Sequence, residues 1–438
     1  MSSTAPLVPR RALIGAMLAL PLLGGAAGCT RSSGVDAEAA QASRGPITAW
    51  FSYDQFELQW GADLVERWNA EHPDEPIRMQ EIPAGRSSEE VITAAITAGT
   101  TPDLLFSVAL APLPMWARSG GLVDLTTFDG AEQYAVERTG AERVEQFLID
   151  GGLYVLPWKT GPVMIMYNKE LFAAAGLDPD NPGMDTYDRF LDGARALVST
   201  GAAPSAIWPN PGSEFYNPWY DFYPLFLAET GGTQLVEDGV AMFTSEVGLG
   251  VARFWEELYR GGLAPQERSV DDAMGTSSTA MQITGPWAVA AYRDLIDVGF
   301  MPVPTARGVP ADEVVTFADS KNIAMFSTSQ NRATAWDVIR FATSLEQDGA
   351  FLEVTGQMPL RTDLPGTFND YFEKNPLYAG YGASAARAVD VPLIPNSIEV
   401  WQRFRGAFSA SVIFGDVPVE EAFGGLGSAV EQLVEVPR

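Results

Sequence analysis

Apolar and polar positions follow two different periods in the first part of the globular chain. Residues 47–51, 77–82 and 103–108 are short runs rich in β-forming side chains, and each run predicts a strand. Between them, residues 58–68 and 89–98 carry apolar side chains at helical spacing. Strand and helix therefore alternate, which is the signature of an α/β fold. We expect a doubly wound sheet in a first lobe.

An uncharged apolar segment, residues 12–28, precedes this region and follows the pair Arg10 and Arg11. It ends in small residues, as a cleaved export signal does. Its length of about 17 residues is marginal for a membrane span, which needs about 20. The small residues resemble a bacterial lipobox and are followed by Cys29, which we expect to carry a lipid. The general and the twin-arginine export routes both stay open.

Size and charge limit the function. The chain has 438 residues, of which 46% are hydrophobic and 11% aromatic. That is ample for a globular body, and the length predicts two lobes. Acidic side chains number 56 against 28 basic ones, so the formal net charge is −28. This charge argues against binding to nucleic acid, to anionic membrane surfaces and to anionic ligands.

The reactive side chains are few. Cys29 is the single cysteine and His72 the single histidine. Disulfides, cysteine zinc sites and most histidine triads are therefore excluded. The sequence also lacks a phosphate-binding loop and a serine nucleophile motif. We expect no catalysis, no cofactor and no metal.

Several sequence blocks occur in one order over nearly all of the chain that follows the export signal. The blocks are 98–104, 154–158, 164–177, 280–287, 302–304, 331–344 and 356–359. Together they resemble the extracellular solute-binding proteins of bacterial ABC importers, sugar-binding type (family 1), in lipoprotein form. One departure is the stretch 318–321, Ala-Asp-Ser-Lys, where this family often has a pair of glycines.

The resemblance implies an α/β fold of the two-lobe, periplasmic-binding-protein-like type (type II), with the ligand in the cleft between the lobes. It also implies a division of the chain that alternates between the lobes. We expect an export signal at 1–28, a lipidated cysteine and flexible tether at 29–45, N-lobe segments at 46–157 and 306–357, and C-lobe segments at 158–305 and 358–438.

The function that the resemblance implies is capture of a neutral mono- or oligosaccharide and its delivery to the permease subunits of an ABC importer. The protein would be a monomer on the extracellular face of the cell membrane, held there by its lipid anchor alone. Three alternatives stay open. They are a receptor of the same fold for polyamines or other cations, a secreted carbohydrate-active enzyme that uses a carboxylate pair, and a scaffold of the cell envelope.

A sugar has hydroxyl groups around its edge and apolar C–H faces, so its site needs flat rings and side chains that both donate and accept hydrogen bonds. The predicted aromatic ligand residues are Tyr53, Trp158, Trp219, Tyr220 and Trp287, with Trp208, Tyr216 and Tyr223 as further candidates. The predicted polar ligand residues, which lie after strands or at lobe crossings, are Asp54, Ser107, Lys159, Asp319, Lys321, Gln357 and Arg361, with Ser52 as a further candidate.

Each of these residues also has a structural interpretation. Asp54 could cap the following helix instead of accepting from a ligand hydroxyl. Lys159 and Lys321 could form salt bridges at the hinge. Trp287 could pack in a core, and Arg361 could be a solvated loop residue. For Trp50 and Trp68, which lie in strand and helix patterns, core packing is the prediction.

Overall fold

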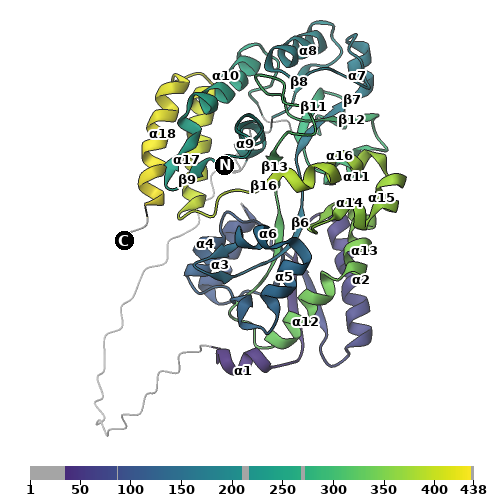
Figure 1. Ribbon diagram of the computed structural model, residues 1–438, viewed down its shortest axis with the longest axis vertical. Coiled ribbons are helices and arrows are strands. Elements are labelled where there is room, and N and C mark those ends of the chain that lie inside the picture. Colours follow the sequence, from purple (N-terminus) through teal and green to yellow (C-terminus); the bar gives the residue numbers. More distant parts are fainter. Residues whose placement is uncertain (1–34, 86, 210–216, 268–271, 436–438) are drawn as a thin grey trace, which may run out of the picture. The chain divides into compact units, whose positions relative to one another are not determined.

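The structure is a computed structural model that describes residues 35–85, 87–209, 217–267 and 272–435, except the side chains of 217–219. Residues 35–438 form one compact unit (Figure 1). The expected export signal at 1–28 and the lipidated Cys29 lie outside the described residues. Among the helices that are described, none is both long and apolar enough for a membrane span.

The first lobe is built on a six-stranded sheet in the order β15-β6-β14-β3-β1-β2. Strand β1 pairs in parallel with β2 and β3, while β14 runs antiparallel to β3 and β6. The strands are β1 Ile47–Phe51, β2 Ile77–Glu81, β3 Leu104–Val108, β6 Leu156–Thr160, β14 Lys321–Met325 and β15 Met358–Pro359. The three strands predicted between 47 and 108 are confirmed.

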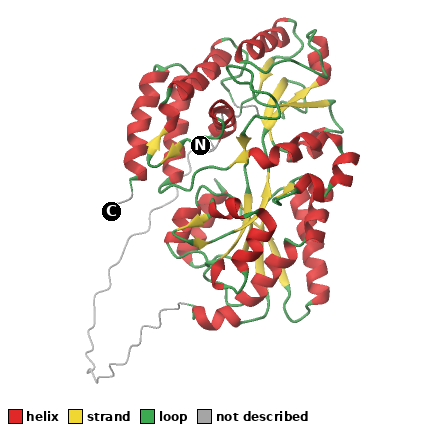
Figure 2. Ribbon diagram, in the orientation of Figure 1, coloured by secondary structure: helices red, strands yellow, loops and turns green. Residues whose placement is uncertain are grey.

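Helices cover this sheet, as Figure 2 shows. They are α1 Ala37–Ala42, α2 Gln55–Glu71, α3 Ser88–Ala98, α4 Leu113–Arg118, α5 Ala131–Thr139, α6 Ala141–Glu145, α12 Arg332–Ala342 and α13 Leu345–Thr355. Helix α3 ends at Gly99, whose φ of 66° is in the left-handed region that favours glycine at a helix end. Trp50 and Trp68 are buried, as their patterns predict.

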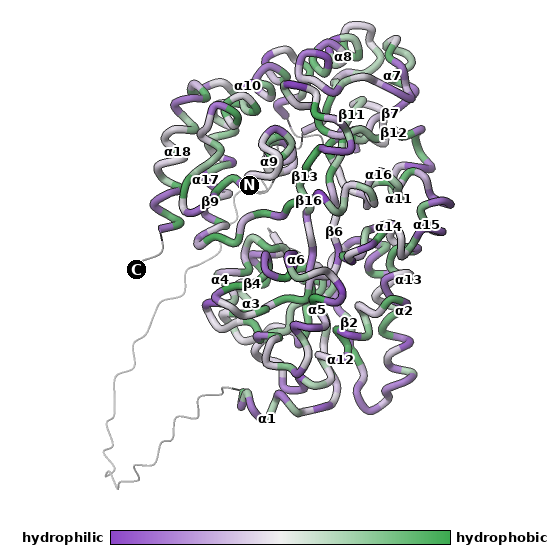
Figure 3. The backbone as a smooth tube through the Cα atoms, in the orientation of Figure 1, coloured by the Kyte–Doolittle hydropathy of each residue, from purple (hydrophilic) through white to green (hydrophobic). Residues whose placement is uncertain are grey.

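The second lobe is built on a four-stranded sheet in the order β12-β7-β11-β8. Its strands are β7 Met164–Asn168, β8 Ser205–Ile207, β11 Thr279–Thr284 and β12 Val298–Met301. Its helices are α7 Lys169–Ala174, α8 Tyr187–Ser199, α9 Asn217–Thr230, α10 Glu246–Arg260, α11 Trp287–Tyr292, α17 Ser397–Phe408 and α18 Val419–Val434. Along α18, hydrophobic and hydrophilic positions alternate (Figure 3), because one face packs on the lobe and the other faces solvent.

The chain crosses between the sheets at three places. It leaves the first sheet after β6, returns to it through β13 Thr316–Phe317 and leaves it again after β15. Strand β13 pairs with β16 Ala388–Val389. Near the crossings lie α14 Leu364–Thr367, α15 Asn369–Lys374 and α16 Pro376–Ser384, and smaller hairpins are β4 Leu148–Ile149 with β5 Gly152–Leu153 and β9 Val236–Glu237 with β10 Val240–Ala241. The expected segment borders at 158, 306 and 358 fall close to these crossings.

The expected tether, residues 29–45, is folded in its described part. Residues 37–42 form α1, which is capped by the side chain of Asp36. After it, Arg44 forms ion pairs with Glu75 at 2.8 Å and with Asp337 at 2.7 Å. An alanine-rich segment therefore docks on the first lobe, because a helix cap and two carboxylates on the lobe hold it.

Candidate functional site

A cavity of about 760 Å³ is lined by residues of both lobes. The first lobe contributes the loops that follow β1, β2 and β3, together with the start of α2. The second lobe contributes α9, the end of β11 and the start of α11. The crossing segments form the remaining part of the wall. Open α/β sheets bind ligands beyond the carboxyl ends of their strands, which is where the first-lobe residues lie.

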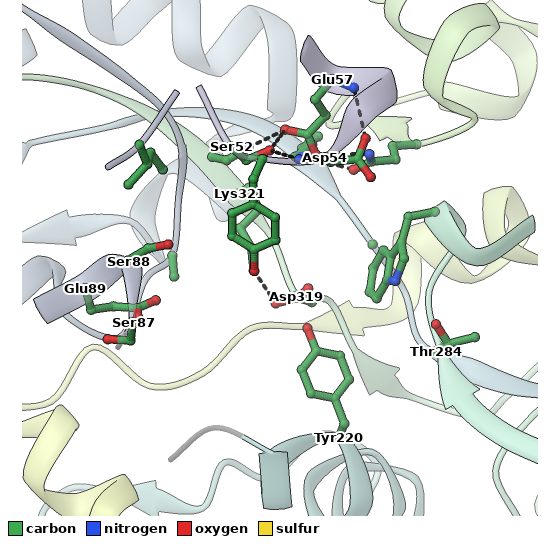
Figure 4. A pocket seen from close by; sticks show the side chains of 18 of the residues that line it. Ser52, Asp54, Glu57, Ser87, Ser88, Glu89, Tyr220, Thr284, Asp319 and Lys321 are labelled. Carbon is green, nitrogen blue, oxygen red and sulfur yellow. Dashed lines mark hydrogen bonds and ion pairs between the residues drawn. The ribbon is translucent and has the colours of Figure 1, made fainter. Parts of the chain in front are cut away.

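A buried carboxylate, Glu57, is the centre of the first-lobe wall. Ser52 and Ser107 donate hydrogen bonds to it at 2.7 and 2.6 Å, and Gln357 Nε2 donates another at 3.0 Å. Lys159 forms an ion pair with it and also donates to Gln357 Oε1 at 2.8 Å. Figure 4 shows Glu57 and Ser52 side by side on this wall. The network brings together five residues from separate segments of the chain.

Local structure places these groups. Asp54 caps α2 by accepting from the backbone N–H groups of Phe56 and Glu57, so Glu57 lies in the first turn of the helix. There the helix dipole favours a negative charge. Ser107, in β3, has a φ of 65°, which is uncommon for a residue with a side chain and is typical of functional sites. In that conformation its hydroxyl group reaches Glu57.

The charge state of Glu57 follows from its partners. Burial raises the pKa of its carboxyl group, but the charge of Lys159 and the hydrogen bonds from Lys159, Ser107 and Ser52 outweigh burial and lower it below the ordinary value. Glu57 is therefore ionised at neutral pH, and it neutralises the buried charge of Lys159. The pair is suited to hold hydrogen-bonding groups in place, and not to transfer protons.

A second ion pair lies at the return crossing, between Asp319 and Lys321. Burial lowers the pKa of the Lys321 ammonium, but the charge and hydrogen bond of Asp319 outweigh burial and raise it. Asp319 has a φ of 41°, another left-handed conformation of a residue with a side chain. Both lysines in the cavity wall thus have a carboxylate partner within the protein.

Aromatic rings form part of the second-lobe wall. The rings of Tyr220 and Trp287 meet edge to face at 6.3 Å between centroids. Trp287 lies against two glycines, Gly161 and Gly285, and a Cβ atom at Gly161 would be 2.6 Å from its indole ring. Tyr53 extends from the opposite wall and is 74% exposed. The cavity thus offers flat apolar faces and a dense set of hydrogen-bonding groups.

The family of the chain follows from comparison with known proteins. The family model described as bacterial extracellular solute-binding protein matches residues 57–348. The chain belongs to this family. The match covers more than half of the chain, and it includes the first-lobe wall around Glu57 and the second-lobe wall around Trp287.

Two relatives of this solute-binding protein have similar lengths. The diacetylchitobiose binding protein DasA of Streptomyces coelicolor is 25% identical over 367 residues, which cover 80% of each chain. The maltodextrin-binding protein MdxE of Bacillus subtilis is 25% identical over 321 residues, which cover 69% of this chain and 71% of the relative. Both relatives, like the family, are named as binding proteins.

A solved structure shows the same fold. It is an ABC transporter solute-binding protein of Thermotoga lettingae bound with α-D-tagatose, with a TM-score of 0.75 and 22% sequence identity. The alignment covers 89% of this chain and 100% of that one. The predicted two-lobe fold of periplasmic binding proteins is therefore confirmed.

Most of the predicted ligand residues line the cavity. They are Tyr53, Asp54, Ser107, Lys159, Tyr220, Trp287, Asp319, Lys321 and Gln357, and the further candidates Ser52 and Trp208 also line it. Asp54 both caps α2 and lines the cavity, so its two interpretations hold together. Lys159 and Lys321 form the ion pairs that the alternative interpretation describes. The side chain of Trp219 and all of Tyr216 lie outside the described residues.

Trp158 is a correction. Its ring is fully buried in the core of the first lobe, 4.9 Å from the ring of Phe351 and 5.3 Å from that of Trp60. Successive side chains of a strand point to opposite faces. Because Lys159 faces the cavity, its neighbour Trp158 faces the core.

Arg361 and Tyr223 are corrections as well, since neither lines the cavity. Arg361 forms an ion pair with Asp348, a buried carboxylate that also pairs with Arg138. A buried charge needs such partners, and this need draws Arg361 away from the cleft. Tyr223 is buried and donates a hydrogen bond to the backbone oxygen of Asp390 at 2.8 Å.

Several lining residues were not predicted. They include Glu57, Glu81, Ser87, Ser88, Glu89, Asp221, Gln282 and Thr284. Glu57 lies three positions after the cap Asp54, a spacing typical of a capping box, which hides any other role. Glu81 ends β2, and Ser87 to Glu89 follow it. The rule that ligand residues follow strands, when applied to β2, would have found these four residues.

Proposed function

We propose that this protein captures a neutral mono- or oligosaccharide in the cavity between its lobes and delivers it to the permease subunits of an ABC importer. The observation that carries the proposal is the composition of the cavity wall. Aromatic rings of Tyr53, Tyr220 and Trp287 stand near a hydrogen-bonded network of carboxylate, hydroxyl, amide and ammonium groups. Rings match the C–H faces of a sugar, and the polar groups match its hydroxyls.

The charges of the wall support a neutral ligand. Lys159 and Lys321 are each paired with a carboxylate of the protein, so neither needs an anionic ligand. The presence of two ammonium groups in the wall argues against polyamines and other cations. The names of the relatives agree with a sugar, since DasA is named for diacetylchitobiose, MdxE for maltodextrin, and the Thermotoga protein was solved with tagatose.

The proposal extends to the place of the protein in the cell. Cys29 would carry a lipid that holds a monomer on the extracellular face of the membrane, and the protein would catalyse no reaction. The apolar segment 12–28 and the small residues before Cys29 support this part. Mass spectrometry of the protein from its native membrane tests it, because a lipid adds a defined mass at the modified N-terminus.

A thermal-shift and calorimetry panel tests the ligand class. It contains maltose, maltotriose, N,N′-diacetylchitobiose, tagatose and spermidine. A ligand at about 100 times its dissociation constant stabilises the folded state by about 2.7 kcal/mol. We expect at least one sugar series to raise the melting temperature and spermidine to leave it unchanged. Stabilisation by spermidine alone contradicts the neutral-sugar proposal.

The variant Tyr53→Ala tests whether the exposed ring contacts the sugar. Ring stacking contributes about 0.5–1.5 kcal/mol, so affinity falls by up to about tenfold. Because the ring is 74% exposed, the melting temperature of the free protein stays unchanged. Phe414→Ala is the matched control, since Phe414 is 55% exposed and lies outside the cavity wall. Equal affinities of the two variants by calorimetry would exclude Tyr53 from the site.

A further inference from the structure

Asp221, in α9, is a buried carboxyl group in the second-lobe wall. The residue is 4% exposed, and it lines the cavity. Within the described part of the chain, no side chain or backbone group donates a hydrogen bond to its carboxyl oxygens, and no basic side chain pairs with it. Its situation is the reverse of that of Glu57, which has four partners.

The surroundings of Asp221 fix its position without satisfying its carboxyl group. Trp255 Nε1 donates a hydrogen bond to the backbone oxygen of Asp221 at 2.7 Å. The preceding residue, Tyr220, packs against Trp287 in the cavity wall. Tyr259 lies near enough for Asp221 to influence its pKa, which burial and then Asp221 raise. The Tyr259 hydroxyl group has no hydrogen-bond partner among the described residues, so it does not complete Asp221 either.

A buried polar group without a partner destabilises a protein, so its retention in a cavity wall indicates a partner from outside. Burial also raises the pKa of the Asp221 carboxyl group well above its ordinary range. The group is then a neutral acid that both donates and accepts a hydrogen bond, as a sugar hydroxyl does. A cation would instead require an ionised carboxylate in this apolar environment.

We propose that Asp221 is a specificity-determining residue of the cleft, whose carboxyl group completes its hydrogen bonds with a hydroxyl group of the bound sugar beside the ring of Tyr220. This inference rests on the proposed sugar-binding function. It adds one specific contact on the second-lobe wall, and it predicts a hydroxyl group at one position of the sugar.

The test compares Asp221→Leu, Asp221→Ala and Asp221→Asn with the unchanged protein. Affinity for whichever sugar of the panel binds is measured by calorimetry, and the melting temperature of the free protein by calorimetric scanning. The Leu and Ala variants remove an unsatisfied polar group, so the free protein melts at the same or a higher temperature. They also lose the hydrogen bond, and affinity falls about tenfold. The Asn variant both donates and accepts, and it binds within about threefold of the original affinity.

Analogues of the bound sugar that lack one hydroxyl group identify the contact. One such analogue binds the unchanged protein about tenfold more weakly than the parent sugar, yet binds Asp221→Ala as well as the parent does. Asp348→Asn is the contrast variant, because Asp348 is buried and paired with Arg138 and Arg361. It lowers the melting temperature.

Three results overturn the inference. If the Leu and Ala variants lower the melting temperature as Asp348→Asn does, Asp221 has a structural partner. If they bind the sugar as tightly as the unchanged protein, Asp221 does not contact it, and the proposed function still stands. If the unchanged protein binds no sugar at all, the proposed function fails first, and the inference fails with it. Should the Leu variant not fold, the Ala variant decides.

Discussion

The two walls of the cavity differ in how completely their polar groups are satisfied without a ligand. In the first-lobe wall, Glu57 accepts from Ser52, Ser107, Lys159 and Gln357. In the second-lobe wall, Asp221 has no such donors among the described residues. The first wall is therefore pre-organised by the protein, whereas the second leaves hydrogen bonds for the ligand. Such a division suits a protein whose lobes close around a ligand, because contacts made only on closure favour the closed state.

Removing the centre of the first wall should have the largest effect. Glu57→Ala leaves the buried ammonium of Lys159 without its ion-pair partner, and breaking a buried pair costs about 3–5 kcal/mol. We expect the free energy of unfolding, measured with urea, to fall by about that amount. A fall below about 1 kcal/mol would show that the first wall is not pre-organised.

The matched control for this change is Glu346→Ala. Glu346 forms an ion pair with Arg67, but the two side chains are 71% and 44% exposed. Exposed pairs contribute about 0–1 kcal/mol, so this variant should unfold almost as the unchanged protein does. The pair of variants separates the effect of a buried charge from the effect of losing any ion pair.

A smaller effect is expected from crowding the second wall. In Gly161→Ala the new Cβ atom would be 2.6 Å from the indole ring of Trp287, so the ring has to move. Overpacking of this kind costs about 1–3 kcal/mol. We expect sugar affinity, measured by calorimetry, to fall along with the free energy of unfolding.

Gly424→Ala is the control for this change, because no atom lies within 4 Å of the new Cβ atom. In the middle of α18 it should stabilise the protein by up to about 1 kcal/mol. Unchanged sugar binding by Gly161→Ala would show that the position of Trp287 does not matter to the ligand.

The pH dependence of stability should show the smallest effect. The folded-state pKa of Glu57 lies below its ordinary value of 4.5, so its stabilising contribution is present above that pH and is lost as pH falls through the folded-state pKa. Glu57→Gln lacks this contribution at every pH. The difference in free energy of unfolding between the unchanged protein and Glu57→Gln should therefore shrink on acidification below about pH 4.5. A constant difference would mean that Glu57 is not ionised in the folded protein.

The sequence predicted the elements of the first lobe well, because their signals are local. The periods of residues 47–51 and 89–98 determine a strand and a helix within a few positions, and Gly99 marks a helix end through its own backbone. The rule that ligand residues follow strands found Asp54 and Ser107. It would have found Glu81 too if it had been applied to β2.

The errors have physical reasons that a linear pattern does not contain. Trp158 and Lys159 were both assigned to the cleft, although neighbours in a strand face opposite sides. Arg361 was assigned to the cleft because a buried carboxylate elsewhere, Asp348, was not foreseen as its partner. Glu57 was overlooked because its spacing from Asp54 has a sufficient local explanation.

The sequence by itself determined the order of strands and helices, the scarcity of reactive side chains and the family resemblance, since each depends on residues close together or on composition. Only the tertiary structure decided which groups meet. Glu57 and Gln357 are 300 positions apart, yet they share a hydrogen bond. A buried charge needs several donors from separate segments, and no local period records where those segments come together. The same holds for Asp221, whose missing partners are evident only once its neighbours are in place.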